Sequence, residues 1–225
     1  MKKQSLIKGT LILGIAGVFA KFLGLFFRWP LIMLIGDEGI GYYQMSYPLY
    51  MFFIGIASGI PVAISKMVSE RNAFNDEGSI LLVIKKAFLT MLILGGGFSV
   101  VFLVFPRELV TFFKWDKKAV YSLMGIGAAP VFISLMSVFR GFFQGMQNMT
   151  YTAVSQIIEQ IGRVVFGVGL AFLLLPMGIE YAAGGAAFGA AAGGIAGFLY
   201  LSIKYLLAKK QLKVKKVKKD DTILT

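Results

Sequence analysis

The chain has 225 residues, of which 57% are hydrophobic and 15% are charged, and its net charge is +12 at pH 7. Soluble domains contain about 45–50% apolar and about 25% charged residues, so this composition, with a mean hydropathy of +0.77, indicates an integral membrane protein. Cysteine and histidine are absent, which excludes disulfides, thiolate nucleophiles, imidazole bases and most zinc sites.

Six apolar stretches approach the roughly 20 residues that cross a bilayer core of about 30 Å. We expect an all-α integral membrane protein, a bundle of six transmembrane helices at residues 8–35, 42–65, 80–104, 119–146, 151–175 and 182–206. The basic start of the chain resembles a signal peptide, but the apolar pattern continues past Lys21 and Arg28, which indicates a retained span. Residues 1–206 then form one transmembrane lobe, and residues 207–225 form a basic tail.

The first predicted span carries two positive charges, Lys21 and Arg28, two turns apart on one face. A charged side chain in the bilayer costs about 2.5–3.5 kcal/mol on insertion scales, so we expect both to point into protein or into a water-filled cavity. Their own helix contains no acidic partner. Unpaired cations are suited to an anionic ligand such as a phosphate. The alternatives are snorkelling to the interface or pairing with another part of the protein.

Lysine and arginine are distributed unequally between the two ends of the predicted bundle. About fifteen lie on the side of the N-terminus, the second loop and the tail, and four lie on the other side. The positive-inside rule therefore predicts a cell-membrane protein with both termini in the cytoplasm. The tail is expected to bind anionic membrane lipids, and no nucleic acid.

The loop at residues 105–118 is more basic than an outside loop should be. We expect it to form a short interfacial helix, with Phe112, Phe113 and Trp115 in the headgroup layer.

The stretch QGMQNMTYTAVSQIIEQIGR, residues 144–163, is polar within an apolar chain. Its side chains and a preceding arginine fall on two helix faces: Arg140, Gln144 and Gln147 on span 4, and Gln156, Glu159, Gln160 and Arg163 on span 5. A tight turn between the spans would bring Arg140 and Glu159 to similar depth. Glu159 then pairs with Arg163 one turn on, or with Arg140 across the hairpin. The cluster is either a structural network or a gate at the cytoplasmic end of a cavity.

Glycines recur every four residues along span 6, at Gly185, Gly189, Gly193 and Gly197. Such a ridge lets another helix backbone approach closely. The pairs Gly55/Gly59 and Gly141/Gly145 repeat the spacing, and we expect helix packing at all three places. A second interpretation adds mobility, because prolines near the spans allow kinked helices: Pro30, Pro48, Pro61 and Pro130.

Motifs of common catalytic sites are missing from the sequence. It contains neither GxxxxGK[ST] nor HExxH. Ser65 and Lys66 are adjacent, but neighbouring residues of a helix point apart, so they do not form a dyad. We therefore expect a membrane transporter that is not an enzyme, without a metal or a cofactor.

Three stretches carry a resemblance to a known family: KGTLILGIAGVFAKFLGLFFRWPLI, GDEGIGYYQMSYPLYMFFIGIASGIPVAISKMVSE and FRGFFQGMQNMTYTAVSQIIEQIGRVV. Together they resemble the stage V sporulation protein B group of polysaccharide transporters. That group belongs to the multidrug/oligosaccharidyl-lipid/polysaccharide exporter superfamily, with the lipid II flippases. The resemblance covers residues 2–206, and the pattern RGxxQGxQNMTxTAxSQxxEQ is its most specific part.

The resemblance implies two lobes of six or seven helices around a central cavity that moves undecaprenyl-linked sugars, such as peptidoglycan precursors, by alternating access. It also implies that cations of the first helix meet the diphosphate. Lys21 in KFLG matches the first of these, with lysine in place of arginine, and Arg28 matches the second with a displacement of one residue. Family members are about twice as long, so the chain corresponds to the N-terminal lobe. We expect it to need a second lobe, from a separate chain or by self-association.

Two other functions stay open at this point. One is a multidrug or cation-coupled exporter of the same superfamily, which would need acidic residues in its cavity, where Glu159 alone offers itself. The other is a scaffold that does not transport. The carried sugar and the driving ion are not specified by the sequence.

Overall fold

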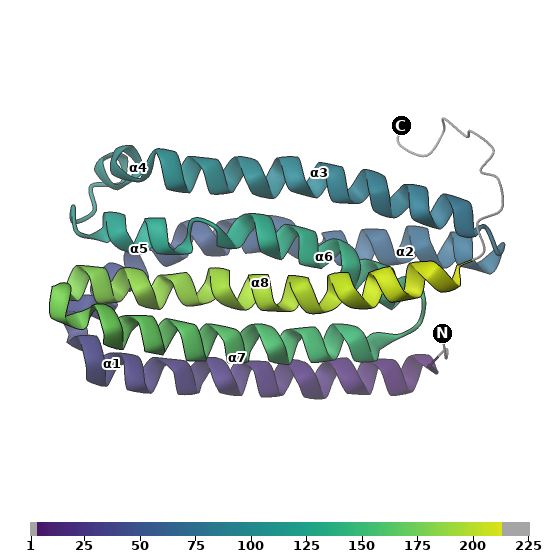
Figure 1. Ribbon diagram of the computed structural model, residues 1–225, viewed down its shortest axis with the longest axis horizontal. Coiled ribbons are helices and arrows are strands. Elements are labelled where there is room, and N and C mark those ends of the chain that lie inside the picture. The colour runs from purple at the N-terminus through teal and green to yellow at the C-terminus, as the bar shows by residue number, and fades with distance from the viewer. Residues whose placement is uncertain (1–3, 213–225) are drawn as a thin grey trace.

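The computed structural model describes residues 4–212, and this part of the chain is a bundle of helices joined by short turns (Figure 1). The elements are α1 (Leu6–Ser58), α2 (Ile60–Ala73), α3 (Glu77–Val104), α4 (Pro106–Phe112), α5 (Ala119–Ile126), α6 (Ala129–Gly145), α7 (Met149–Leu174), the 3-10 helix η1 (Leu175–Met177) and α8 (Ile179–Gln211). Within the described residues, five helical segments are long and apolar enough to cross a membrane. The predicted all-α membrane bundle is confirmed.

Helix α1 folds back on itself at Gly36. The backbone there has φ 61° and ψ −171°, a conformation that favours glycine because it has no Cβ. In Figure 1 the first arm of α1 runs from the N-terminal end of the bundle to the opposite end. The second arm runs back behind α5 and α6. The predicted loop 36–41 is thus a single-residue reversal, and residues 37–41 are helical. The first membrane segment therefore crosses twice, which gives the six expected crossings.

Two helix breaks precede prolines. Gly59 separates α1 from α2, and residues 127–128 separate α5 from α6; Pro61 and Pro130 lie in the first turns of α2 and α6. Proline is tolerated there because the first-turn N–H groups have no partner within the helix. The span predicted at residues 119–146 is therefore two helices.

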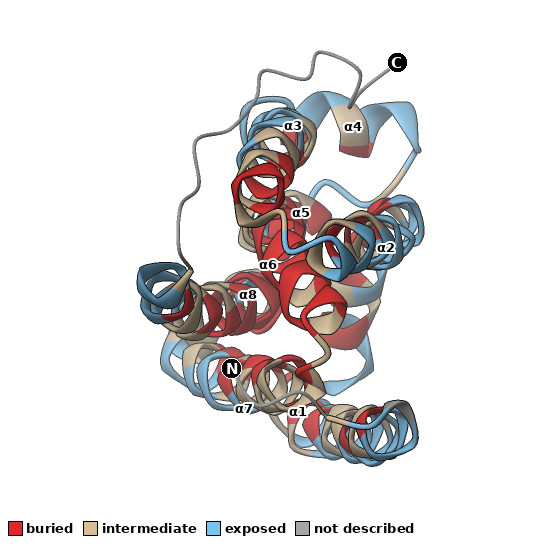
Figure 2. Cartoon of the chain, turned by 90° about the vertical axis from the view of Figure 1, so that its right-hand side faces the viewer, coloured by how far each residue is buried: buried red, intermediate tan, exposed pale blue. Residues whose placement is uncertain are grey.

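Helix α6 forms the centre of the bundle. Of its 17 residues 13 are buried, so every side of it is covered by other helices. Figure 2 shows the buried residues gathered in α5, α6 and the inner face of α8, whereas the outer faces of α1 and α3 are exposed. This arrangement leaves α1, which carries Lys21 and Arg28, at the outside of the bundle.

The glycine ridge of α8 lies against the backbone of α7. A Cβ at Gly189 would lie 2.6 Å from the Arg163 carbonyl oxygen, and one at Gly193 would overlap the Glu159 carbonyl oxygen. Real Cβ atoms do not approach so closely, so only glycine allows this packing. The predicted close approach of span 6 is confirmed.

The two shorter glycine pairs differ. Gly141 and Gly145 lie against α2, where added Cβ atoms would be 2.7 Å and 2.6 Å from the Cβ atoms of Ile64 and Val68. Gly55 and Gly59 have nothing within 4 Å, so the prediction of helix packing was wrong for this pair within the described chain. The sequence spacing alone did not indicate which helix faces have a partner.

Gln4 joins the start of the chain to the start of α7. Its side-chain oxygen accepts from the Met149 N–H at 3.0 Å, and its amide nitrogen donates to the Thr150 hydroxyl at 2.6 Å. Its backbone N–H also donates to the Gln147 carbonyl at 2.9 Å. These bonds cap α7 and hold the first arm of α1 beside it.

The short helix predicted within residues 105–118 is present as α4. Phe113 stacks on Trp115 with ring centres 5.0 Å apart, and the position of these rings in the headgroup layer stays a prediction. Helix α8 continues to Gln211, past the expected boundary at residue 206. Most of the predicted tail, residues 213–225, lies outside the described residues.

Replacing Gly193 by alanine should lower the free energy of unfolding by about 1–3 kcal/mol, because the new Cβ overlaps the α7 backbone and forces the helices apart. Gly96→Ala is the matched control, since a Cβ at Gly96 meets nothing within 4 Å and alanine favours helix by up to about 1 kcal/mol. Denaturant titration in detergent, followed by circular dichroism, measures both. Equal losses in the two variants would contradict the packing described here.

Candidate functional site

Lys21 and Arg28 lie on the first arm of α1, and both line one pocket of about 540 Å³. No hydrogen bond or ion pair within residues 4–212 involves either side chain. Both residues are exposed, so the pocket opens toward the outside of the chain. The structure thus places the two cations together in a hollow, without acidic partners.

The walls of this pocket come from both arms of α1 and from α7. The lining residues are Lys21, Gly24, Leu25, Phe27, Arg28, Leu31, Ile40, Tyr43, Gln44, Tyr47 and Arg163. Three of them are cations and none is a carboxylate. The polar neutral groups, two tyrosine hydroxyls and one amide, come from the second arm of α1. The pocket is therefore positively charged and has additional hydrogen-bond donors.

Arg163 connects this pocket to the polar cluster of α6 and α7. Its Nη2 donates to Glu159 Oε1 at 3.4 Å and to the Tyr50 hydroxyl at 3.1 Å. Its Nε atom is buried and has no partner in the described part of the protein. Arg163 therefore lines the pocket, while Glu159 and Tyr50 bind its Nη2 and its Nε stays buried.

Glu159 is also bound from α6. Arg140 Nη2 donates to Glu159 Oε2 at 2.9 Å, and Arg140 Nε donates to the Ser155 hydroxyl at 3.0 Å. The structure thus has both pairings that the sequence left open. Only 11% of the Glu159 side chain is exposed, so water contributes little, and the two arginines supply the compensating charge.

Three of the four glutamines of the predicted cluster are placed differently from its charged residues. Gln144, Gln156 and Gln160 are half-buried, and none makes a hydrogen bond to the three charged residues within the described chain. The Gln156 Oε1 atom is buried without a partner there. The structure therefore brings together Arg140, Glu159 and Arg163, whereas the role of the glutamines in a gate stays a prediction.

Sequence reasoning missed the tyrosines of the second arm. Tyr43, Tyr47 and Tyr50 are spaced i, i+4, i+7, so they share one helix face. Neighbouring ring centres are 6.1 Å and 6.0 Å apart. This regular spacing was the signal that could have identified a polar face on span 2. No comparable pattern in the sequence indicated that Gln44 lines the pocket.

A second charged cluster lies at the opposite end of the bundle from the N-terminus. Lys118 Nζ is 3.6 Å from Glu38 Oε1 and 3.8 Å from Glu180 Oε2, and the Tyr42 hydroxyl donates to Glu38 at 2.7 Å. The Glu180 carboxylate, with smaller effects of Tyr42 and Glu38, raises the pKa of Lys118. These contacts join the α1 reversal to the starts of α5 and α8, and they offset part of the positive charge of the 105–118 loop.

The fold and the charged pocket define a multi-pass helical membrane protein of a transporter fold. Solved structures share it: a MOP superfamily transporter from Pyrococcus furiosus has a TM-score of 0.74 at 15% identity, covering 96% of this chain and 52% of that one. The outward-facing form of a multidrug resistance MATE family transporter gives 0.73 at 14% identity with the same coverage. These similarities establish the fold alone.

The chain belongs to the polysaccharide biosynthesis protein family, whose family model matches residues 6–222. It is 37% identical to stage V sporulation protein B of Bacillus subtilis over 96% of this chain and 42% of the relative. It is 32% identical to the lipid II flippase MurJ of the same organism, over 93% of this chain and 41% of the relative. The resemblance noted from the sequence is confirmed, and the chain spans about two fifths of these relatives.

Replacing Glu159 by glutamine should lower the free energy of unfolding by about 3–5 kcal/mol, because it leaves Arg140 and Arg163 as unpaired charges in an apolar bundle. Glu70→Gln removes an exposed carboxylate of α2 and should change the stability by less than about 0.5 kcal/mol. Chemical denaturation in detergent measures both variants. Adding Arg140→Gln to the Glu159 variant should recover part of the loss; no recovery would argue against a charge effect.

Proposed function

We propose that this chain is one lobe, the N-terminal one, of a flippase for an undecaprenyl-linked oligosaccharide or peptidoglycan precursor. The observation that carries the proposal is a pocket that Lys21, Arg28 and Arg163 line, and that no carboxylate of residues 4–212 lines. A pyrophosphate that links a lipid to a sugar brings the negative charge that this pocket lacks. The names of the relatives, a sporulation protein and a lipid II flippase, support a substrate of cell-wall synthesis.

The roles of the three cations follow from their chemistry. Arg28 presents a planar fork that matches phosphate oxygens in pairs, and Lys21 acts as a compact point charge. Arg163 adds a third positive charge to the lining of the pocket. Tyr43, Tyr47 and Gln44 then supply neutral donors and acceptors to the phosphate or the first sugar.

The outer face of α1 supports a requirement for a second lobe. It exposes large apolar residues, including Val18 at 71% and Leu25 at 70%. Gly14, Gly17 and Gly24 on the same arm have nothing within 4 Å, although small residues in membrane helices favour close packing. A second lobe, supplied by a longer chain or by a separate one, would cover this face and close the open side of the pocket.

The distribution of charge supports an orientation in the cell membrane. The start of α1 and the end of α8 lie at the same end of the bundle (Figure 1). Lysine and arginine are frequent at this end, for example Arg71, Lys86 and Lys210. By the positive-inside rule this end faces the cytoplasm. Alternating access would then carry the charged headgroup from this side to the other.

Export of a cationic drug is the less favoured function. A cation-binding cavity needs carboxylates, and none lines the pocket among the described residues. Glu159 contacts the lining residue Arg163, but two arginines already bind this carboxylate. A scaffold without transport would leave the cationic pocket without a use.

In the complete two-lobe transporter, Lys21→Gln and Arg28→Gln should each slow the flipping of a fluorescent undecaprenyl-pyrophosphate sugar by about 10-fold or more. The reason is that a hydrogen bond to a charged group contributes about 1.5–3 kcal/mol. Lys8→Gln, on the same helix but outside the pocket, is the control. Flipping in proteoliposomes is the measurement, and wild-type rates in both pocket variants would refute the proposed contact.

Reconstituted alone at one copy per vesicle, this chain should not flip the same probe, because half of the cavity wall is missing. Addition of the second lobe as a separate chain should restore flipping. Transport by the isolated chain at this density would contradict the proposed need for a second lobe.

A further inference from the structure

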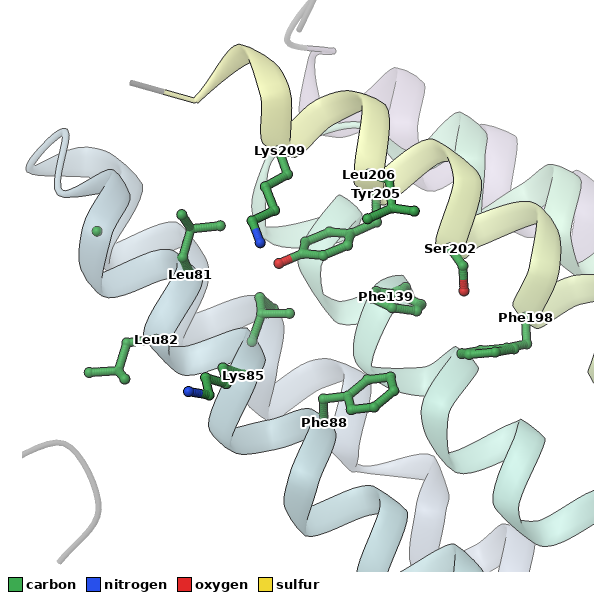
Figure 3. Close-up of a pocket in the computed structure, with 12 residues that line it drawn as sticks. Leu81, Leu82, Lys85, Phe88, Phe139, Phe198, Ser202, Tyr205, Leu206 and Lys209 are labelled. Atoms are coloured by element: carbon green, nitrogen blue, oxygen red, sulfur yellow. The ribbon is translucent and has the colours of Figure 1, made fainter. Parts of the chain in front are cut away.

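A second pocket lies between α3 and α8, with α6 as its floor (Figure 3). Its volume is about 590 Å³, and it shares no lining residue with the pocket of Lys21 and Arg28. Helix α3 packs chiefly against α6, which leaves this crevice open toward the side of the bundle. It is a candidate for a ligand that approaches from the membrane.

The polar groups of the crevice favour an anion. Lys85 of α3 and Lys209 of α8 both line it and are both exposed, and no carboxylate is among its lining residues. The Ser202 hydroxyl oxygen is buried and has no hydrogen-bond partner within the described residues. Figure 3 shows the Lys209 ammonium and the Tyr205 hydroxyl both extending from α8 toward α3.

The remaining wall is apolar and aromatic. Phe139 of α6 is at its centre, with ring centres 5.9 Å from Phe88, 5.8 Å from Phe198 and 4.9 Å from Tyr205. Leucines of α3 and α8 form the rim (Figure 3). Such a wall is suited to a hydrocarbon chain, and it directly adjoins the charged groups.

The charges lie near one end of the bundle. Lys85 is eight residues into α3, about 12 Å along the helix axis, and Lys209 is in the last turn of α8. The start of α3 and the end of α8 lie at the end of the bundle where the N-terminus lies (Figure 1). A headgroup at the interface would reach the lysines there, while its chain would extend along the phenylalanines into the bilayer. Basic pockets between membrane helices are known to bind anionic headgroups in this way.

We infer that the crevice between α3 and α8 binds one anionic diacyl phospholipid. Its phosphate lies between Lys85 and Lys209, the Tyr205 and Ser202 hydroxyls bond to the phosphate or the glycerol esters, and an acyl chain lies on Phe88, Phe139 and Phe198. A zwitterionic lipid is disfavoured because its own cation would lie close to two lysines. The bound lipid bridges α3 and α8, and this role does not depend on the proposed transport.

The test uses native mass spectrometry of the full chain in detergent, titrated with phosphatidylglycerol or with phosphatidylcholine of the same acyl chains. The variant K85Q/K209Q should bind phosphatidylglycerol about 30-fold more weakly than the wild type, since each lysine near a lipid phosphate contributes roughly fivefold. The matched control is K86Q/K210Q, which removes the same charge from the neighbouring positions outside the crevice. It should weaken binding less than about twofold.

A second variant fills the crevice and keeps its charges. Ser202→Phe should also reduce binding of phosphatidylglycerol by about 10-fold or more, because the new ring occupies the space of the acyl chain. Circular dichroism establishes that each variant keeps the wild-type helix content. Replacement of both Lys21 and Arg28 by glutamine should leave this binding unchanged, so failure of the transport proposal and failure of the lipid site give different results.

Four outcomes would overturn the inference. Equal loss of binding in K85Q/K209Q and K86Q/K210Q would indicate that general surface charge, and not the crevice, binds the lipid. Phosphatidylcholine could bind as tightly as phosphatidylglycerol. Inorganic phosphate at the lipid's concentration could displace the lipid, which indicates a site for the headgroup alone. Undecaprenyl phosphate could bind more tightly than phosphatidylglycerol, which indicates that the crevice takes polyprenyl chains.

Discussion

Glu159 binds Arg140 of α6 and Arg163 of α7 inside an apolar bundle, and these contacts determine how α6 and α7 face each other. An unpaired charge at this depth would be costly, because neither lipid nor water is available to stabilise it. Rotation of α7 about its axis would separate Glu159 from Arg140, so the ion pairs fix that rotation. With α7 held in this orientation, Arg163 faces the first arm of α1, where it is the third cation of the pocket.

The glycines of α8 extend this constraint to a third helix. Gly193 lies directly on the Glu159 carbonyl, and Gly189 lies on the carbonyl of Arg163. The residues that carry the buried charges therefore also receive a close backbone contact of α8. A shift of α8 by one residue would place a Cβ against α7 and disturb the ion pairs. Packing and electrostatics thus act at the same turn of α7, and the shape of the cationic pocket depends on both.

The sequence predicted those features that depend on one helix at a time. Apolar length located the six crossings, and charge within the first span identified Lys21 and Arg28. The sequence did not predict how each helix is oriented about its own axis relative to its neighbours. Arg163 was therefore assigned only to the cluster around Glu159, although it also lines the pocket, and Gly55 and Gly59 were expected to pack although their face is open. The reversal at Gly36 was predicted as a longer loop, because apolar periodicity does not reveal a single residue with positive φ.

The charge of the pocket cannot be balanced from within the described chain. Four cationic side chains, Lys21, Arg28, Arg140 and Arg163, form the pocket and its adjoining cluster, and Glu159 is their one carboxylate. Glu38 of α1 and Glu180 of α8 lie at the far end of the bundle, where both are bound to Lys118. Compensation must therefore come from outside these helices, by water and anions while the pocket is open or by a bound ligand. Under the function proposed above, a ligand with a phosphate group would supply this charge as it enters and remove it as it leaves, as a transport site requires.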